Sequence, residues 1–141
     1  EPTRLYTRPC LTVARTEAAR VHAFSHVTGG GLAANLARVL PVGLVAELDR
    51  TSWVVPPIFD LVRRLGSVPW SDLENTLNLG IGMVAVVAQE GVDTALATLA
   101  ASGVPAWVLG RVGADDGSSE VLRGTKGVHG GGVRLRGDYR A

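Results

Sequence analysis

The sequence predicts an α+β domain: a mixed β-sheet with helices packed on it, of the split β-α-β type (β-α-β-β-α-β), with extra helices in the middle. Short apolar runs of strand length alternate with segments whose apolar residues recur at helical spacing, and Gly or Pro residues separate them. With 141 residues, of which 46% are hydrophobic, the chain suffices for one domain with a single core. Such a fold serves enzymes, binding modules and interaction domains alike, so it does not define a function.

The first half of the fold begins with a strand, a turn and a helix. Residues 21–24 form a strand-like run that ends at the Gly-rich segment 25–31. The apolar residues that follow recur at helical spacing until Pro41 ends the helix, and they are Leu32, Leu36, Val39 and Leu40. A second strand is expected over 44–48.

Two helices are expected in the middle of the chain. Pro57 suits the first turn of a helix that has one apolar face and ends at Gly66. The apolar face comprises Ile58, Leu61, Val62 and Leu65. A short helix should start at Ser71, because Ser71 and Glu74 have the spacing of a capping box.

The second half adds strands and one helix. The continuous apolar run 82–87 predicts a central strand buried on both faces. A helix over 92–102 and a strand over 106–111 follow. Residues 113–132 are rich in Gly, Asp and Ser, which is typical of a mobile loop, and the alternation over 133–136 predicts a short edge strand.

Composition excludes several classes of protein. A net charge of +1, dispersed basic residues and 5% aromatic residues argue against nucleic-acid binding. The longest near-apolar stretch, 79–88, is far shorter than the ~20 residues that span a bilayer, so no membrane partner is expected. Cys10 is the only cysteine, and neither His22 nor His129 lies at metal-ligand spacing, so we expect neither a disulfide nor a metal site. No targeting segment opens the sequence, which fits a reducing cytoplasm.

The segment from His26 to Gly31, His-Val-Thr-Gly-Gly-Gly, is the first candidate site. Its glycines let the backbone approach a ligand, and unpaired N–H groups at the start of the next helix favour an anion such as phosphate. Thr28 can cap that helix or donate its hydroxyl to a phosphate, and His26 can bind a ligand or act as general acid or base. Equally, the glycines can serve only a tight turn, with His26 bonded to a nearby carbonyl.

The segment 78–82, Asn-Leu-Gly-Ile-Gly, is the second candidate. Asn78 can offer a donor and an acceptor to a ligand, beside the backbone amide of Gly80. The glycines can instead permit close packing where the chain enters a strand. Trp53, which lies in a turn, can stack on a ligand or act as a packing anchor.

Six short motifs follow one another along residues 1–112. They are Pro2–Tyr6, His26–Gly31, Asn35–Pro41 (Asn-Leu-Ala-Arg-Val-Leu-Pro), Asp49–Pro56 (Asp-x-x-Ser-Trp-x-x-Pro), Asn78–Met83 and Ala106-Trp107. In this order they resemble the C-terminal half of the aminoimidazole ribonucleotide (AIR) synthetase family, the phosphoribosylformylglycinamidine cyclo-ligases. The chain departs from that family at Asn75, where an Arg is common, and over 124–132, which has no recognised counterpart.

The resemblance implies a ligase of purine biosynthesis that uses ATP to activate the formyl amide oxygen of formylglycinamidine ribonucleotide. An amidine nitrogen then closes the imidazole ring, and ADP and phosphate leave. ATP and Mg²⁺ would be bound mainly by an N-terminal domain that this chain lacks and that also builds a homodimer. This half would therefore contact the small-molecule substrate without being active alone.

The resemblance also implies a domain division and a set of site residues. Residues 1–112 would form the C-terminal domain, and residues 113–141 the Gly-rich loop and edge strand of the same domain. His26 would be catalytic. The residues that would bind the substrate or its phosphate are Thr28, Gly29, Gly30, Gly31, Asn78 and Gly80.

Two other classes of function remain open at this point. One is a related member of the same ATP-dependent superfamily, such as formylglycinamidine synthetase, selenophosphate synthetase or thiamine monophosphate kinase. The order of the Pro-Thr-Arg and His-x-Thr-Gly-Gly-Gly motifs favours the cyclo-ligase over these. The other is a free-standing module that holds an anion or effector at the Gly-rich turn; a separate reading frame with its own start codon would favour it.

Overall fold

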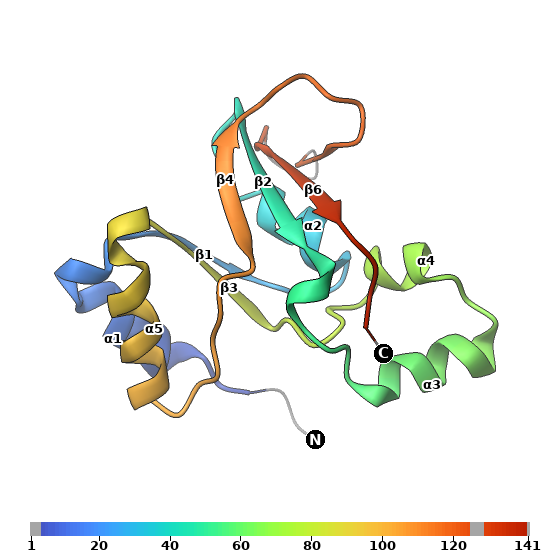
Figure 1. The fold of residues 1–141 in the computed structure, drawn as a ribbon, viewed down its shortest axis with the longest axis horizontal. Helices are drawn as coiled ribbons and strands as arrows, with labels where there is room; N and C mark the ends of the chain where they lie inside the picture. The colour runs from blue at the N-terminus through green and yellow to red at the C-terminus, as the bar shows by residue number, and fades with distance from the viewer. Residues whose placement is uncertain (1–3, 125–128, 141) are drawn as a thin grey trace. The chain divides into compact units, whose positions relative to one another are not determined.

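Helices and strands alternate along the chain in the computed structural model, which describes residues 4–124 and 129–140. The α+β class is therefore confirmed (Figure 1). The chain divides into two compact units. Unit 1 comprises residues 1–25 and 83–108, and unit 2 comprises residues 26–82 and 109–141.

Unit 1 packs two helices beside a two-stranded sheet. The strands are β1 (Val21–His26, whose last residue belongs to unit 2) and β3 (Met83–Val87), and the helices are α1 (Thr7–Arg15) and α5 (Val92–Ala101). Figure 1 shows α1 and α5 side by side. The short 3-10 helices η1 (Glu17–Ala19) and η3 (Gln89–Gly91) complete the unit.

The core of unit 1 is small. Val13, Ala19 and Ala95 are buried, and the partly buried side chains of Val21, Val87 and Leu99 pack against them. Gly91 lies directly on η1, because a Cβ atom there would meet the Ala19 carbonyl oxygen at 2.2 Å. Glycine at this position lets the two 3-10 helices touch.

Unit 2 contains a mixed four-stranded sheet in the order β4-β2-β6-β5. Its strands are β2 (Leu44–Asp49), β4 (Gly110–Ala114), β5 (Leu122–Arg123) and β6 (Gly132–Arg136). β2 pairs antiparallel with β4 and parallel with β6, while β5 pairs antiparallel with β6. The α2 helix (Gly31–Ala37) packs against β5 and β6, so its apolar residues and those of β2 and β6 form the core of this unit.

The remaining helices of unit 2 follow β2. They are the 3-10 helix η2 (Arg50–Ser52), α3 (Pro57–Gly66) and α4 (Trp70–Glu74). The predicted apolar face of α3 exists but is exposed, with Ile58 58% and Leu65 80% accessible. Among the described residues, no helix is long and apolar enough to cross a membrane.

Three strand predictions differ from the structure. Over the described residues β3 has one strand neighbour, β1, and all five of its residues are partly exposed, so the prediction of a central strand buried on both faces is wrong. The strand expected over 106–111 begins at Gly110 instead. β6 is an interior strand and not an edge strand, since it lies between β2 and β5.

These differences arise because strand pairing is non-local. The alternation of Val and Arg in β6 is typical of a half-exposed strand. Arg134 is nevertheless only 8% exposed, because its guanidinium donates to Asp116 at 2.6 Å and to Glu47 at 3.4 Å. A buried arginine paired in this way does not show in the local pattern.

The helix starting near Ser71 exists, but its predicted capping box is wrong. Helix α4 begins at Trp70 and has Pro69 at its N-cap, with no side-chain cap hydrogen bond. The Ser71 hydroxyl hydrogen-bonds the neighbouring Asp72 carboxylate at 3.4 Å instead. The α1 helix was not anticipated, because Arg, Thr and Pro break its apolar pattern.

The described part of segment 113–132, predicted as a mobile loop, contains turns that side-chain hydrogen bonds and an ion pair stabilise. The Asp115 carboxylate accepts the Gly117 amide at 2.9 Å, and Asp116 accepts the Ser118 amide at 3.0 Å. Asp115 also pairs with Arg123 of β5. Residues 125–128 of this segment lie outside the described residues.

Candidate functional site

The first glycine turn, Thr28–Gly31, joins β1 to α2. Gly30 and Gly31 have φ values of +97° and +73°, which side chains rarely adopt. The Gly31 amide donates to the Thr28 carbonyl at 3.3 Å. A Cβ atom at Gly31 would lie 1.7 Å from the Glu74 carbonyl oxygen. The last two glycines are therefore needed by the fold itself.

Gly29 differs from the two glycines that follow it. It is exposed, its φ is not positive, and a Cβ atom built there meets nothing within 4 Å. Within the described residues, the Gly29 and Gly30 amides donate to no backbone carbonyl. No contact among the described residues of this unit therefore explains a glycine at position 29.

Asn35 of α2 holds the shape of the first glycine turn. It is 6% exposed, and its Nδ2 group donates to the carbonyl oxygens of Gly31 at 2.7 Å and of Thr28 and Gly29 at 3.3 Å. Its Oδ1 atom lies 3.5 Å from the Thr28 hydroxyl. This role of Asn35 is not among the sequence-based predictions, although an amide residue on an otherwise apolar helix face is a signal that points to it.

The predicted capping role of Thr28 is wrong. The N-cap of α2 is Gly30, and no side chain caps this helix. The Thr28 hydroxyl points to Asn35 over a long contact, and Thr28 is exposed. Because α2 has only seven residues, its helix dipole supplies little positive charge at this turn.

The second glycine turn, Asn78–Gly82, lies beside the first, since the Val27 amide donates to the Gly82 carbonyl at 3.0 Å. Asn78 Oδ1 accepts the Gly80 amide at 3.1 Å. Gly80 has a φ of +98°, and a Cβ atom there would lie 2.7 Å from Pro56 Cδ. Both residues therefore have clear structural roles.

Trp53 acts as a packing anchor. It is 7% exposed, and its Nε1 donates to the Leu79 carbonyl at 3.0 Å. The indole therefore holds the second glycine turn from inside the unit and presents no face for a ligand to stack on.

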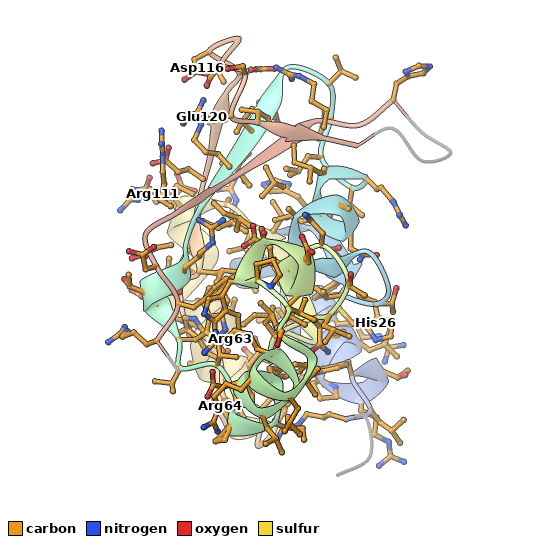
Figure 2. All side chains as sticks on the ribbon, turned by 90° about the vertical axis from the view of Figure 1, so that its right-hand side faces the viewer. His26, Arg63, Arg64, Arg111, Asp116 and Glu120 are labelled. Atoms are coloured by element: carbon orange, nitrogen blue, oxygen red, sulfur yellow. The ribbon has the colours of Figure 1, made fainter. Side chains whose placement is uncertain are left out.

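His26 is exposed and ends β1, two residues before Thr28 (Figure 2). Figure 2 shows it well apart from Asp116 and Glu120 at the other end of the same unit. The structure thus brings together His26, the first glycine turn and the second glycine turn.

Comparison with known proteins identifies the family. Residues 1–123 match the family model described as AIR synthase related protein, C-terminal domain. The chain belongs to this family.

The relatives of this AIR synthase-related chain carry cyclo-ligase names. A putative phosphoribosylformylglycinamidine cyclo-ligase of Streptomyces fradiae is 54% identical over 139 residues, which cover 99% of this chain and 71% of that protein. The phosphoribosylformylglycinamidine cyclo-ligases of Myxococcus xanthus and Bacillus subtilis are 44% and 40% identical, over 86% and 83% of this chain. The chain spans 35% and 33% of those two proteins, about a third of their length.

Over residues 4–124 and 129–140, no group of three or more His, Cys, Asp or Glu side chains is placed to hold a metal ion. Two of the carboxylates in this part of the chain form ion pairs, Asp115 with Arg123 and Asp116 with Arg134.

Cys10 of α1 is partly buried, and burial raises the pKa of its thiol. A raised pKa leaves the thiol protonated near neutral pH, which fits a packing role better than a nucleophilic one.

Proposed function

We propose that this chain is the substrate-binding C-terminal part of an ATP-dependent ligase that cyclises formylglycinamidine ribonucleotide to aminoimidazole ribonucleotide in purine biosynthesis. Its family and the names of its relatives support the reaction class. The observation that carries the site is Gly29, an exposed glycine that no contact among the described residues of its unit requires. A ligand that approaches the backbone closely would require it.

In this proposal the first glycine turn binds the phosphate of the ribonucleotide. The amides of Gly29 and Gly30 are donors for which a phosphate offers acceptors. The Thr28 hydroxyl, which donates to Asn35 Oδ1 over 3.5 Å, would turn from Asn35 to the phosphate. Gly31 shapes the turn, while Asn78 and Gly80 border it from the second glycine turn. Asn78 uses its carbonyl oxygen on Gly80, so its amide N–H groups are the ones proposed to donate to the substrate.

His26 is proposed as the acid or base of the cyclisation. Bound ATP would turn the formyl oxygen into a phosphorylated leaving group. The amidine nitrogen that forms the new C–N bond must then lose a proton, and an exposed imidazole beside the phosphate site can accept it.

The whole enzyme proposed here is larger than this chain. ATP and Mg²⁺ would be held mainly by a preceding domain, which would also form the homodimer, and the enzyme would work in the cytoplasm. The cyclo-ligase names of the relatives favour this reaction over those of formylglycinamidine synthetase, selenophosphate synthetase and thiamine monophosphate kinase.

An NMR titration of the 141-residue chain tests the site. Formylglycinamidine ribonucleotide should shift the amide resonances from Thr28 to Gly31, while ATP at the same concentration should not. Inorganic phosphate alone is the second control. Equal affinity for phosphate and for the ribonucleotide would support a general anion-binding module instead, and no shift with any of the three would contradict the site.

A matched pair of variants tests whether ligand binding requires a glycine at position 29. Gly29→Ala and Gly113→Ala each add a methyl group at an exposed position where a Cβ atom meets nothing within 4 Å and φ is not positive. Gly29→Ala should weaken ribonucleotide binding about tenfold, while Gly113→Ala should leave the Kd unchanged. Equal Kd values for both variants would contradict the proposal that the ligand requires a glycine at position 29.

His26→Ala tests the proposed proton transfer in a full-length enzyme that contains this domain. Loss of a general acid or base lowers kcat about 10²-fold or more, and KM should change far less. An unchanged kcat would rule out the acid or base role and leave His26 as a binding residue at most.

A further inference from the structure

Three residues from distant parts of unit 2 form a connected polar cluster, here called the Glu74 clamp: Arg50, Glu74 and Tyr139. The Nε and Nη2 atoms of Arg50 each donate to one carboxylate oxygen of Glu74 at 2.9 Å. The Tyr139 hydroxyl donates to Glu74 Oε2 at 2.8 Å. Arg50 Nη1 also donates to the carbonyls of Leu135 at 2.9 Å and Gly137 at 3.2 Å. The Glu74 carboxylate thus accepts three hydrogen bonds.

Aromatic rings shield the Glu74 clamp from water. The Tyr139 ring centroid lies 5.6 Å from that of Trp53 and 5.2 Å from that of Trp70. The side chains of Arg50 and Glu74 are 20% and 15% exposed. Burial and the hydrogen bond to Glu74 raise the pKa of Tyr139, so its hydroxyl stays protonated and remains a donor. A charge-assisted, bidentate pair in such surroundings holds its geometry well.

The Glu74 clamp contacts the first glycine turn directly and reaches the second through Trp53. The backbone carbonyl of Glu74 is the group that Gly31 packs against, with no room for a Cβ atom. Trp53, whose ring meets Tyr139, donates its Nε1 to Leu79 in the second glycine turn. A displacement of Glu74 would therefore move the carbonyl group against which Gly31 packs. A displacement of Tyr139 would loosen the packing of Trp53, whose indole is bonded to Leu79 in the second turn.

We infer that Glu74 is a positioning residue, held by Arg50 and Tyr139, that sets the spacing of the two glycine turns for ligand binding. The identity of the ligand in this inference rests on the proposed function. The Glu74 carboxylate is bonded to Arg50 and Tyr139, and the effect on the turns passes through the backbone of Glu74 and the ring of Trp53. Neither family motifs nor local sequence patterns mark these three residues as one group, because they lie 24 and 65 positions apart.

The test compares Glu74→Gln and Tyr139→Phe with a matched control. Both substitutions keep the side-chain shape and weaken or remove hydrogen bonds of the clamp. Asp60→Asn is the control, because Asp60 also pairs with two arginines, Arg63 at 2.9 Å and Arg64 at 3.0 Å, on helix α3. Figure 2 shows these two arginines together at one end of the unit.

The first measurement uses the chain without ligand. Glu74→Gln and Tyr139→Phe should shift the amide resonances of Gly31 and Gly80 and speed their hydrogen exchange, while Asp60→Asn should leave both unchanged. Unmoved Gly31 and Gly80 amides in both clamp variants would overturn the inference, whatever the outcome for ligand binding.

The second measurement is the Kd for formylglycinamidine ribonucleotide, taken well below the unfolding midpoint of every variant. Each clamp variant should raise Kd about fivefold or more, the lower end of typical coupling between distinct sites. A lower unfolding midpoint with an unchanged Kd would show a merely structural role and overturn the inference. If the unsubstituted chain fails to bind the ribonucleotide, the proposed function fails, and the positioning of the turns is still decided by the ligand-free amides.

Discussion

The two glycine turns lie side by side yet use their residues differently. In the second glycine turn each polar group named has an internal partner: Asn78 Oδ1 accepts the Gly80 amide, and the Leu79 carbonyl accepts the Trp53 indole. In the first glycine turn, the carbonyls bond to Asn35, while Thr28 and Gly29 are exposed. The polar groups of the second turn thus serve its internal packing. The first turn leaves Thr28 and Gly29 exposed, and packing does not require their exposed surface.

The comparison separates two reasons for a glycine. Gly31 and Gly80 satisfy a backbone angle and a close approach, so their presence is explained by the fold. Gly29 satisfies neither. A motif of consecutive glycines can therefore combine positions set by folding with a position that folding leaves open.

The largest effect is expected for Gly31→Ala. The new methyl group would overlap the Glu74 carbonyl at 1.7 Å, and alanine would be strained at a φ of +73°. Strain and overpacking together should lower the free energy of unfolding by about 4 kcal/mol. Urea denaturation followed by circular dichroism measures it. A loss below about 1 kcal/mol would mean that the fold does not require glycine at position 31.

A smaller effect is expected for Trp53→Phe. The substitution removes the donor to Leu79, whose residue is 2% exposed, and leaves a buried carbonyl without its partner. The cost should be about 2 kcal/mol in the free energy of unfolding, with an NMR shift of the Gly80 amide. Trp107→Phe is the control, because Trp107 is 41% exposed. Equal losses in the two variants would contradict an anchoring role for the indole.

Gly29→Ala should change the free energy of unfolding by less than about 0.5 kcal/mol, since its Cβ atom meets no neighbour. The same urea titration used for Gly31→Ala measures it. A loss as large as that of Gly31→Ala would show that the fold needs this glycine as well, and the contrast between the two turns would disappear.

The smallest effect concerns a turn held by charge. Hydrogen bonds from Arg123 and the Gly117 amide lower the pKa of Asp115, and those from Arg134 and the Ser118 amide lower the pKa of Asp116. A carboxylate with a lowered pKa stabilises the folded form above its unfolded pKa, and this stabilisation is lost as pH falls through the lower, folded value. The amide shifts of residues 117 and 118 should thus stay constant from pH 7 to about pH 4 and change only below it. A midpoint above pH 5 for this change in amide shift would contradict the ion pairs. The amide shifts of the two glycine turns, measured in the same titration, serve as the reference.

The sequence predicts what depends on neighbours along the chain. Helix α3 was expected where it lies, because Pro57 and Gly66 mark its ends locally. The place of β6 in the sheet could not be derived from the sequence, because its partner residues are 45–49 and 122–123. In addition, Arg134 is buried, although an arginine in an alternating pattern indicates an exposed position.

The candidate site shows the same limit. The sequence located both glycine turns, but not which of their glycines the fold requires, because that depends on the distant Glu74 carbonyl and on Pro56. Asn35 was visible as part of a motif, while its three carbonyl partners follow from the folded turn alone.

The position of β6 bears on how a protein of this family is divided for study. The family match ends at residue 123, but β6 begins at Gly132, and Val133 inside it is 1% exposed. A piece cut at the end of the family match would leave one side of β2 without its hydrogen-bonding neighbour and expose an open sheet edge to other chains. An expression boundary drawn from the family match alone would therefore yield an aggregation-prone fragment, and a useful piece has to include β6.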